Sequence, residues 1–205
     1  MNTVSLLISA VIQVLLFSFI PFIFWLFTSR KQENFFVWLG LTRPIIRNKV
    51  ELLWLYICFV VVGCLMIIFL LPILSNSPEL ATSQFAAQGA SAIIPAIIYS
   101  FLQTGLSEEI LFRGFINKRL CSRFGFTIAN LSQAILFGSL HAIMLSSING
   151  RFEMRMIGVV LLTGGIGWVL GWISQKKAGG SIIPGWLFHA SSNLLISLFA
   201  MYSLV

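Results

Sequence analysis

The sequence predicts an all-α protein, a polytopic bundle of about six transmembrane helices that forms one structural domain. Of its 205 residues, 58% are hydrophobic and only 9% are charged, and the mean hydropathy is +0.97. An ordinary soluble domain has about 25% charged residues, and a soluble core of this size would not bury so much apolar surface. The apolar residues also fall into segments of about 20 residues, the length that a helix needs to cross a bilayer.

The first two predicted helices and the basic stretch between them make up the N-terminal part, residues 1–89. The first apolar segment covers 4–27 and ends at a Ser-Arg-Lys sequence. A polar stretch follows, and the second apolar segment covers 52–74. The loop 75–89 then carries a proline and a single charge. This pattern predicts two membrane helices joined by a basic loop.

Four further apolar segments make up the C-terminal part, residues 90–205. They cover about 90–116, 126–145, 156–174 and 182–202. Within the third of these, Gly167 and Gly171 form a GxxxG pair. Small residues at this spacing let two helices approach closely in a membrane, so we interpret the pair as a packing feature.

The basic residues predict the orientation in the membrane. Ten Lys and Arg residues lie in the loops after the first, third and fifth helices, and two lie on the opposite side: Arg30, Lys31, Arg43, Arg47, Lys49, Lys118, Arg119, Arg123, Lys176 and Lys177 against Arg151 and Arg155. Cytoplasmic loops are rich in such residues. We therefore expect a multi-pass protein of the cell membrane with both termini outside. The same bias accounts for the net charge of +7, so no nucleic-acid partner is expected.

Few side chains within the predicted membrane helices can do acid–base chemistry. The chain has no Asp, and its six Glu are Glu33, Glu51, Glu79, Glu108, Glu109 and Glu153. Only Glu108 and Glu109 lie near the membrane interior. The two His, His141 and His189, both lie in apolar segments.

The two adjacent glutamates belong to the stretch EEILFR, residues 108–113. Glu109 and Arg113 are four residues apart, so they share a helix face and can pair. Glu108 is rotated by about 100° from its neighbour and cannot fully share that pairing. An ionisable residue inside a bilayer costs about 2.5–3.5 kcal/mol on insertion scales. An ordinary ion pair at a helix end would explain Glu109 and Arg113, but it leaves Glu108 unexplained.

Two later helices carry the histidines in short polar patterns. FGSLH (137–141) places Phe137 and His141 on one helix face, and HASSN (189–193) does the same for His189 and Asn193. A single histidine on an apolar face is more often structural. Two histidines, an amide and two glutamates in separate membrane helices indicate a shared function.

These three patterns resemble the motifs EExxxR, FxxxH and HxxxN/D of the CAAX-protease and bacteriocin-processing (CPBP/Abi) family of intramembrane proteases, which includes type II CAAX prenyl endopeptidases. The order along the chain also agrees, and the resemblance covers about residues 90–203. It implies an endopeptidase that cuts at or within the membrane, with its catalytic core in the last four helices. It also implies a cavity open to the cytoplasm. The expected partner is a membrane-associated peptide or a prenylated protein, such as a CAAX-like tail or a bacteriocin precursor.

The resemblance also assigns roles to individual residues. Glu108 would activate a water molecule, and His141 would help to hold it. His189 and Asn193 would donate hydrogen bonds to the oxyanion of the tetrahedral intermediate. The supporting residues would be Glu109, Arg113 and Phe137.

Three alternatives are left open by the residues. Glu108, His141 and His189 could bind zinc with a water in an open position, although no HExxH sequence is present and the resemblance favours a mechanism without a cofactor. A proton-coupled transporter also uses intramembrane Glu and His, although no paired broken helices are visible. A non-catalytic bacteriocin-immunity protein that binds a toxin or its receptor is the third.

Overall fold

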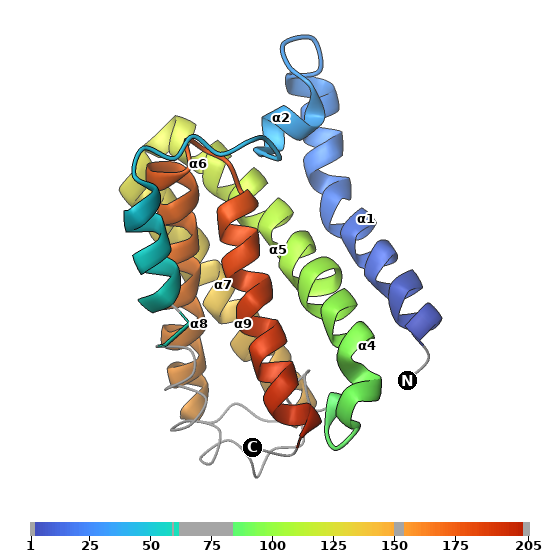
Figure 1. Ribbon diagram of the computed structural model, residues 1–205. Coiled ribbons are helices and arrows are strands. Elements are labelled where there is room, and N and C mark those ends of the chain that lie inside the picture. The colour runs from blue at the N-terminus through green and yellow to red at the C-terminus, as the bar shows by residue number, and fades with distance from the viewer. Residues whose placement is uncertain (1–2, 59, 62–83, 150–153, 203–205) are drawn as a thin grey trace. The chain divides into compact units, whose positions relative to one another are not determined.

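The computed structural model describes residues 3–58, 60–61, 84–149 and 154–202, and every regular element in these ranges is a helix (Figure 1). This confirms the all-α class. Four helical stretches are long and apolar enough to cross a membrane: Thr3–Thr28, Gly89–Phe124, Phe126–Ser147 and Met156–Lys177. The chain is a multi-pass membrane protein, and the count of six spans stays a prediction.

The helices follow one another with few interruptions. The α-helices are α1 (Thr3–Thr28), α2 (Phe35–Leu39), α4 (Ile93–Ile98), α5 (Ser107–Glu109), α6 (Lys118–Phe124), α7 (Phe126–Asn149), α8 (Arg155–Trp172) and α9 (Ile183–Met201). A 3₁₀ turn, η2 (Gly89–Ala92), precedes α4. The remaining stretches are π-helical: η3 (Tyr99–Leu106), η4 (Ile110–Asn117) and η5 (Ile173–Lys177).

The second predicted membrane helix lies only partly within the described residues. The chain is helical at 49–58. Most of the predicted segment 52–74 beyond that point lies outside the described residues, as do Glu79 and Glu153.

The helix that contains the third apolar segment is longer than the sequence predicts. Lys118 and Arg119, which the charge pattern places in a loop, are helical, and the helix continues to Phe124. It ends at Gly125, whose φ of 78° suits a residue without a side chain. Both basic side chains donate to the carbonyl oxygen of Trp38, at 3.5 and 3.2 Å. A local sequence pattern could not predict these contacts, because Trp38 is far from both residues in the chain.

The sixth predicted helix is present as α9, but it is not among the four apolar enough to count as a span. Its mean hydropathy is lowered by polar side chains in its middle, at His189, Ser191, Ser192 and Asn193.

The short helix α2 was not predicted, because it interrupts a polar stretch. The Asn34 side chain accepts a hydrogen bond from the Phe36 backbone N–H at 2.9 Å, and Gly40, at φ 88°, ends the helix. Trp38 is buried, and the guanidinium carbon of Arg119 lies 4.0 Å from the centre of its ring. A cap at each end and one buried aromatic anchor thus stabilise a five-residue helix.

The chain divides into two compact units. The first comprises Met1–Leu16, Arg47–Ser107 and Trp186–Val205, and the second comprises Phe17–Ile46 and Glu108–Gly185. The boundary at residue 90 that the sequence suggests stays a prediction.

The first unit has an apolar core around the start of the third apolar segment. Its buried members are Leu6, Phe85, Ala92, Ala96, Tyr99 and Met201. The rings of Phe85 and Tyr99 meet edge to face, with centroids 5.6 Å apart, a favoured aromatic geometry.

In the second unit, α7 and α8 pack closely at two glycines. A side chain at Gly138 would collide with the carbonyl oxygen of Val160 and would lie 3.0 Å from the nitrogen of Gly164. The two backbones therefore approach closely here, as small residues permit. The predicted GxxxG pair packs differently: Gly167 faces the Phe137 ring and the Arg113 guanidinium.

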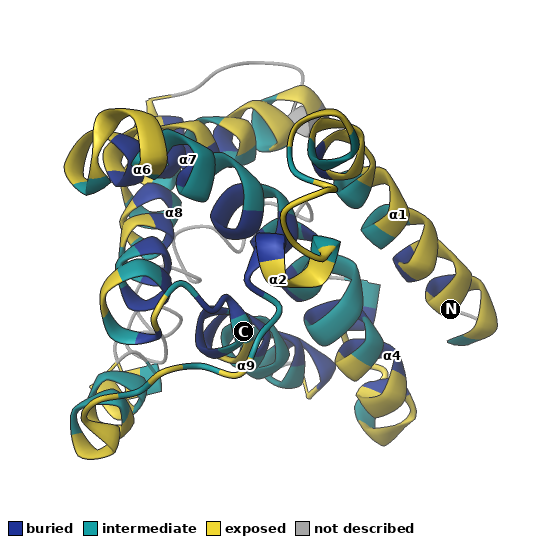
Figure 2. Ribbon diagram, turned by 90° about the horizontal axis from the view of Figure 1, so that it is seen from above, coloured by how far each residue is buried: buried dark blue, intermediate teal, exposed yellow. Residues whose placement is uncertain are grey.

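Much of the apolar surface is exposed, as expected of a membrane protein. Figure 2 shows that α1 is exposed along most of its length. Its exposed side chains include Leu15, Leu16 and Phe27, each more than 60% accessible. Lipid tails are the environment that such a surface suits.

Candidate active site

The EEILFR sequence lies in an irregular part of its helix. Ser107–Glu109 form a single α turn, with π-helical stretches on both sides. Segments of π-helix are rare and often occur at functional sites. This deviation from α geometry is invisible in the hydrophobic pattern, which predicts only a continuous helix.

Glu109 and Arg113 form the ion pair that their spacing predicts. Arg113 Nη1 lies 3.1 Å from Glu109 Oε1, and both side chains are fully buried. Arg113 Nη2 donates to the carbonyl oxygen of Gly167 at 3.4 Å, and the guanidinium carbon lies 4.5 Å from the centre of the Phe137 ring. Charge, hydrogen bonding and cation–π contact thus all hold this arginine in place.

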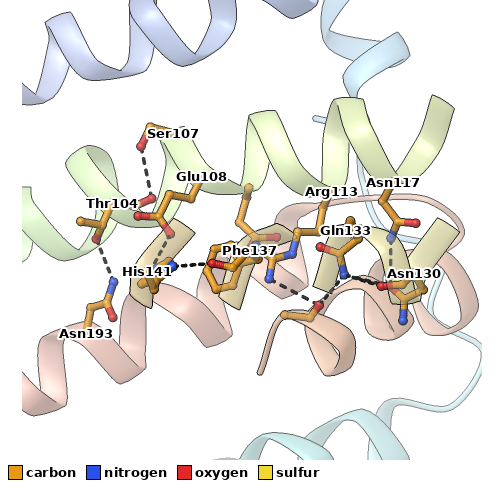
Figure 3. Close-up of polar contacts among 12 residues, drawn as sticks. Thr104, Ser107, Glu108, Arg113, Asn117, Asn130, Gln133, Phe137, His141 and Asn193 are labelled. Carbon is orange, nitrogen blue, oxygen red and sulfur yellow. Dashed lines mark hydrogen bonds and ion pairs between the residues drawn. The ribbon is translucent and has the colours of Figure 1, made fainter. Parts of the chain in front are cut away.

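Glu108 has a different partner. Its Oε2 lies 3.9 Å from Nε2 of His141, and the two side chains are 14% and 29% exposed (Figure 3). A separation of 3.9 Å is longer than a direct hydrogen bond, but one water molecule can bridge two such groups.

The other ring nitrogen of His141 fixes how the imidazole carries its proton. Nδ1 lies 2.8 Å from the carbonyl oxygen of Phe137. A carbonyl oxygen only accepts, so Nδ1 must donate. In the neutral ring, Nε2 then carries no proton and acts as an acceptor. This is the nitrogen that lies nearer to Glu108. The Phe137 ring packs against the imidazole with centroids 4.4 Å apart, which restricts the ring further.

Asn193 and His189 lie on α9, in the first unit. Asn193 Nδ2 donates to Oγ1 of Thr104 at 2.8 Å (Figure 3). His189 is buried, with 7% of its surface exposed. Trp186, at the start of the same helix, donates from Nε1 to the carbonyl oxygen of Phe101 at 2.7 Å. These contacts join α9 to η3.

A layer of buried amides in the second unit was not predicted from the sequence. Asn130 Oδ1 accepts from Asn117 Nδ2 and from Gln133 Nε2, each at 3.2 Å. Gln133 Nε2 also donates to the carbonyl oxygen of Gly167 at 2.8 Å, the same oxygen that Arg113 contacts. Asn130 and Gln133 stand out as polar residues in an apolar segment, and that signal would have identified them.

The structure thus brings predicted residues together in two groups, Glu108 with His141 and Glu109 with Arg113 and Phe137. Asn193 instead meets Thr104, a residue that was not predicted. In the described part of the chain, no three His, Cys, Asp or Glu side chains are grouped as the ligands of a metal ion would be.

One comparison with known proteins matches this region of the chain. A family model described as type II CAAX prenyl endopeptidase, Rce1-like, matches residues 90–195, just over half of the chain. The matched range contains all three motifs, from Glu108 to Asn193. No curated protein and no solved structure matches the chain.

Proposed function

The chain belongs to the Rce1-like family of type II CAAX prenyl endopeptidases, and from this premise we propose that it hydrolyses a peptide bond of a membrane-associated substrate with a water molecule activated by Glu108. The family makes the protein a membrane-embedded peptidase. The observation that supports the glutamate mechanism is the Glu108–His141 pair, which is partly accessible and has a 3.9 Å separation suited to a bridging water.

Glu108 acts as the general base in this proposal. A water molecule donates one hydrogen bond to the Glu108 carboxylate and one to Nε2 of His141, so that its lone pairs face the substrate. The water oxygen attacks the peptide carbonyl carbon while its proton passes to Glu108. The tetrahedral intermediate then breaks its C–N bond, and the leaving amine takes that proton.

Donors for the developing oxyanion come from α9. His189 and Asn193 carry this role, and fixed donors of this kind commonly supply a large part of the rate enhancement. Glu109, Arg113 and Phe137 support the helix that carries Glu108. The buried ion pair favours this division, because both charged groups are already occupied by each other.

We propose a reaction that needs no metal. If a metal were used, Glu108, His141 and His189 would be its ligands, and the carboxylate would then bind the ion instead of removing a proton. The choice between these mechanisms is tested by chelation.

The substrate proposal follows the family. A prenylated CAAX-like tail or a membrane-associated peptide or bacteriocin precursor presents a peptide bond next to the bilayer. The orientation with both termini outside, and an active-site cavity open to the cytoplasm, stays a prediction from the basic loops and the motif resemblance.

The test compares wild type with Glu108→Gln, which keeps the size of the side chain and removes its basicity. Glu33→Gln is the matched control, because Glu33 is exposed in the turn before α2. Each purified protein is incubated with prenylated CAAX tails and with double-glycine leader precursors, with and without EDTA, and mass spectrometry locates the cut.

We expect cleavage by wild type and by Glu33→Gln, unaffected by EDTA, and a loss of about 10²–10⁴-fold for Glu108→Gln. An active Glu108→Gln protein would refute the base assignment. Loss of cleavage with EDTA would indicate a mechanism that depends on a metal ion. If no protein cuts any peptide but all protect cells equally against a bacteriocin, the immunity alternative leads. Uptake driven by a pH gradient in proteoliposomes would favour a transporter.

A further inference from the structure

We propose that Thr104 is a positioning residue that fixes the orientation of the Asn193 side-chain amide. This inference rests on the proposed function, in which Asn193 donates to the oxyanion. Thr104 precedes the EEILFR sequence by four residues and belongs to none of the three motifs.

The hydroxyl of Thr104 has only one proton, and its direction is already set. Oγ1 donates to the carbonyl oxygen of Tyr99 at 3.1 Å. A carbonyl oxygen cannot donate in return, so Oγ1 is left with acceptor capacity only. Asn193 therefore meets it with the amide nitrogen, at 2.8 Å. A flipped amide would place the Asn193 side-chain oxygen against Thr104 Oγ1. Both atoms would then be acceptors, and no hydrogen bond would form between them.

The irregular backbone makes this arrangement possible. A threonine hydroxyl in an α-helix bonds the carbonyl three or four residues earlier, as Thr163 does with Val159 at 2.7 Å. Thr104 lies in the π-helical stretch η3, and its partner, Tyr99, is five residues earlier.

Further contacts on one face of α9 hold it against η3. Trp186, Ala190 and Asn193 are spaced by four and three residues, so they share a helix face. Trp186 Nε1 donates to the Phe101 carbonyl, and a side chain at Gly105 would lie 3.3 Å from Cβ of Ala190. The Thr104–Asn193 bond is therefore made between two helices that are already held in register.

The fixed orientation matters for the proposed reaction. An asparagine amide has two N–H donors. One N–H donates to Thr104, and this contact also fixes the direction in which the second N–H points. A donor held in this way needs no reorganisation when negative charge develops on the substrate oxygen.

The kinetic test uses Thr104→Val, which keeps the shape and removes the hydroxyl, and Thr104→Ser, which restores the hydroxyl. Thr163→Val is the matched control, because its hydroxyl donates within its own helix, to the carbonyl oxygen of Val159. We expect kcat to fall about tenfold in Thr104→Val, with KM within about twofold, because the amide remains but is no longer oriented. Thr104→Ser should recover to within about threefold, and Thr163→Val should match wild type.

A double-mutant cycle separates positioning from general damage. Asn193→Ala should lower kcat by about 10²–10³-fold. Adding Thr104→Val to Asn193→Ala should change kcat by less than about twofold, because the amide through which Thr104 acts is gone. An equal tenfold loss in both backgrounds would overturn the proposal.

A second measurement does not depend on cleavage. In protein labelled with ¹⁵N at asparagine, the side-chain signal of Asn193 is identified by its loss in Asn193→Ala. Thr104→Val should shift this signal and speed the exchange of its protons with water, and Thr104→Ser should leave it close to wild type. If the signal is unchanged in Thr104→Val, the proposal is wrong. If wild type cuts no peptide while the signal shifts as expected, the proposed function fails and the positioning contact stands.

Discussion

Glu108 and Glu109 are neighbours in the chain, but their carboxylates lie in different surroundings. Glu109 is fully buried and lies 3.1 Å from the guanidinium of Arg113, which is also fully buried. Glu108 is partly exposed and lies 3.9 Å from a histidine that is itself 29% exposed. The first is a closed structural contact, and the second is an open pair that can still bind a third group.

The difference shows how one helix can supply both stability and reactivity. Adjacent residues point about 100° apart on a helix, so each carboxylate meets a separate set of neighbours. Phe137 lies beside both sets, because its ring contacts the Arg113 guanidinium and also the His141 imidazole. Substitutions in the two surroundings test whether they differ in their contribution to stability as they differ in geometry.

The largest effect on stability is expected for Glu109→Gln. This change leaves the Arg113 charge buried without its counter-charge, and breaking a buried pair in this way costs about 3–5 kcal/mol. The measurement is the unfolding of the purified protein in detergent, followed by intrinsic tryptophan fluorescence.

Glu108→Gln is the matched control, since it makes the same chemical change one residue earlier. The partly exposed pair with His141 should contribute about 1 kcal/mol or less to stability. Equal destabilisation by the two variants would contradict the distinction between a structural and a reactive glutamate.

A somewhat smaller effect is expected for Gly171→Ala. The added carbon would collide with Asn130 Oδ1 and would lie 2.7 Å from Asn117 Nδ2 and 3.0 Å from Gln133 Nε2. Overpacking and disrupted buried hydrogen bonds together should cost about 2–3 kcal/mol in the same unfolding assay.

The control for Gly171 lies on the same helix. Gly165→Ala adds the same atom where, apart from its chain neighbours and its own helix backbone, no atom of the described residues lies within 4 Å, and it should be neutral or stabilising by up to about 1 kcal/mol. If both alanine variants were as stable as wild type, the buried amides around Gly171 would not contribute to the stability of the buried surroundings of Glu109.

The smallest effect is expected for Phe137→Leu, which removes the ring that lies beside both glutamate surroundings. Loss of the buried cation–π contact with Arg113 should cost about 1–2 kcal/mol. Phe124→Leu is the control, because Arg123 lies 5.4 Å from the centre of an exposed ring there and the cost should be below about 1 kcal/mol. Equal losses in the two variants would show that the buried contact has no special weight.

Much of the fold and part of the site were predictable from local patterns. The observed helix α1 (Thr3–Thr28) begins and ends within a residue of the apolar segment 4–27. The pairing of Glu109 with Arg113 followed from a spacing of four residues, and the structure contains it. Such features depend on neighbours along one helix, which a sequence records directly.

The sequence by itself determined the helical class, the membrane character, most helix positions and the residues that can do chemistry. Only the tertiary structure decided that the Glu109–Arg113 pair is fully buried, which oxygen Gln133 shares with that arginine, and which amide Thr104 meets. It also decided that α6 continues the third helix, where Trp38 accepts from two basic side chains. The physical reason is range: helix periodicity is a property of nearby residues, whereas the contacts Gln133–Gly167, Trp38–Lys118 and Thr104–Asn193 join residues that are 34 to 89 positions apart and depend on how helices pack.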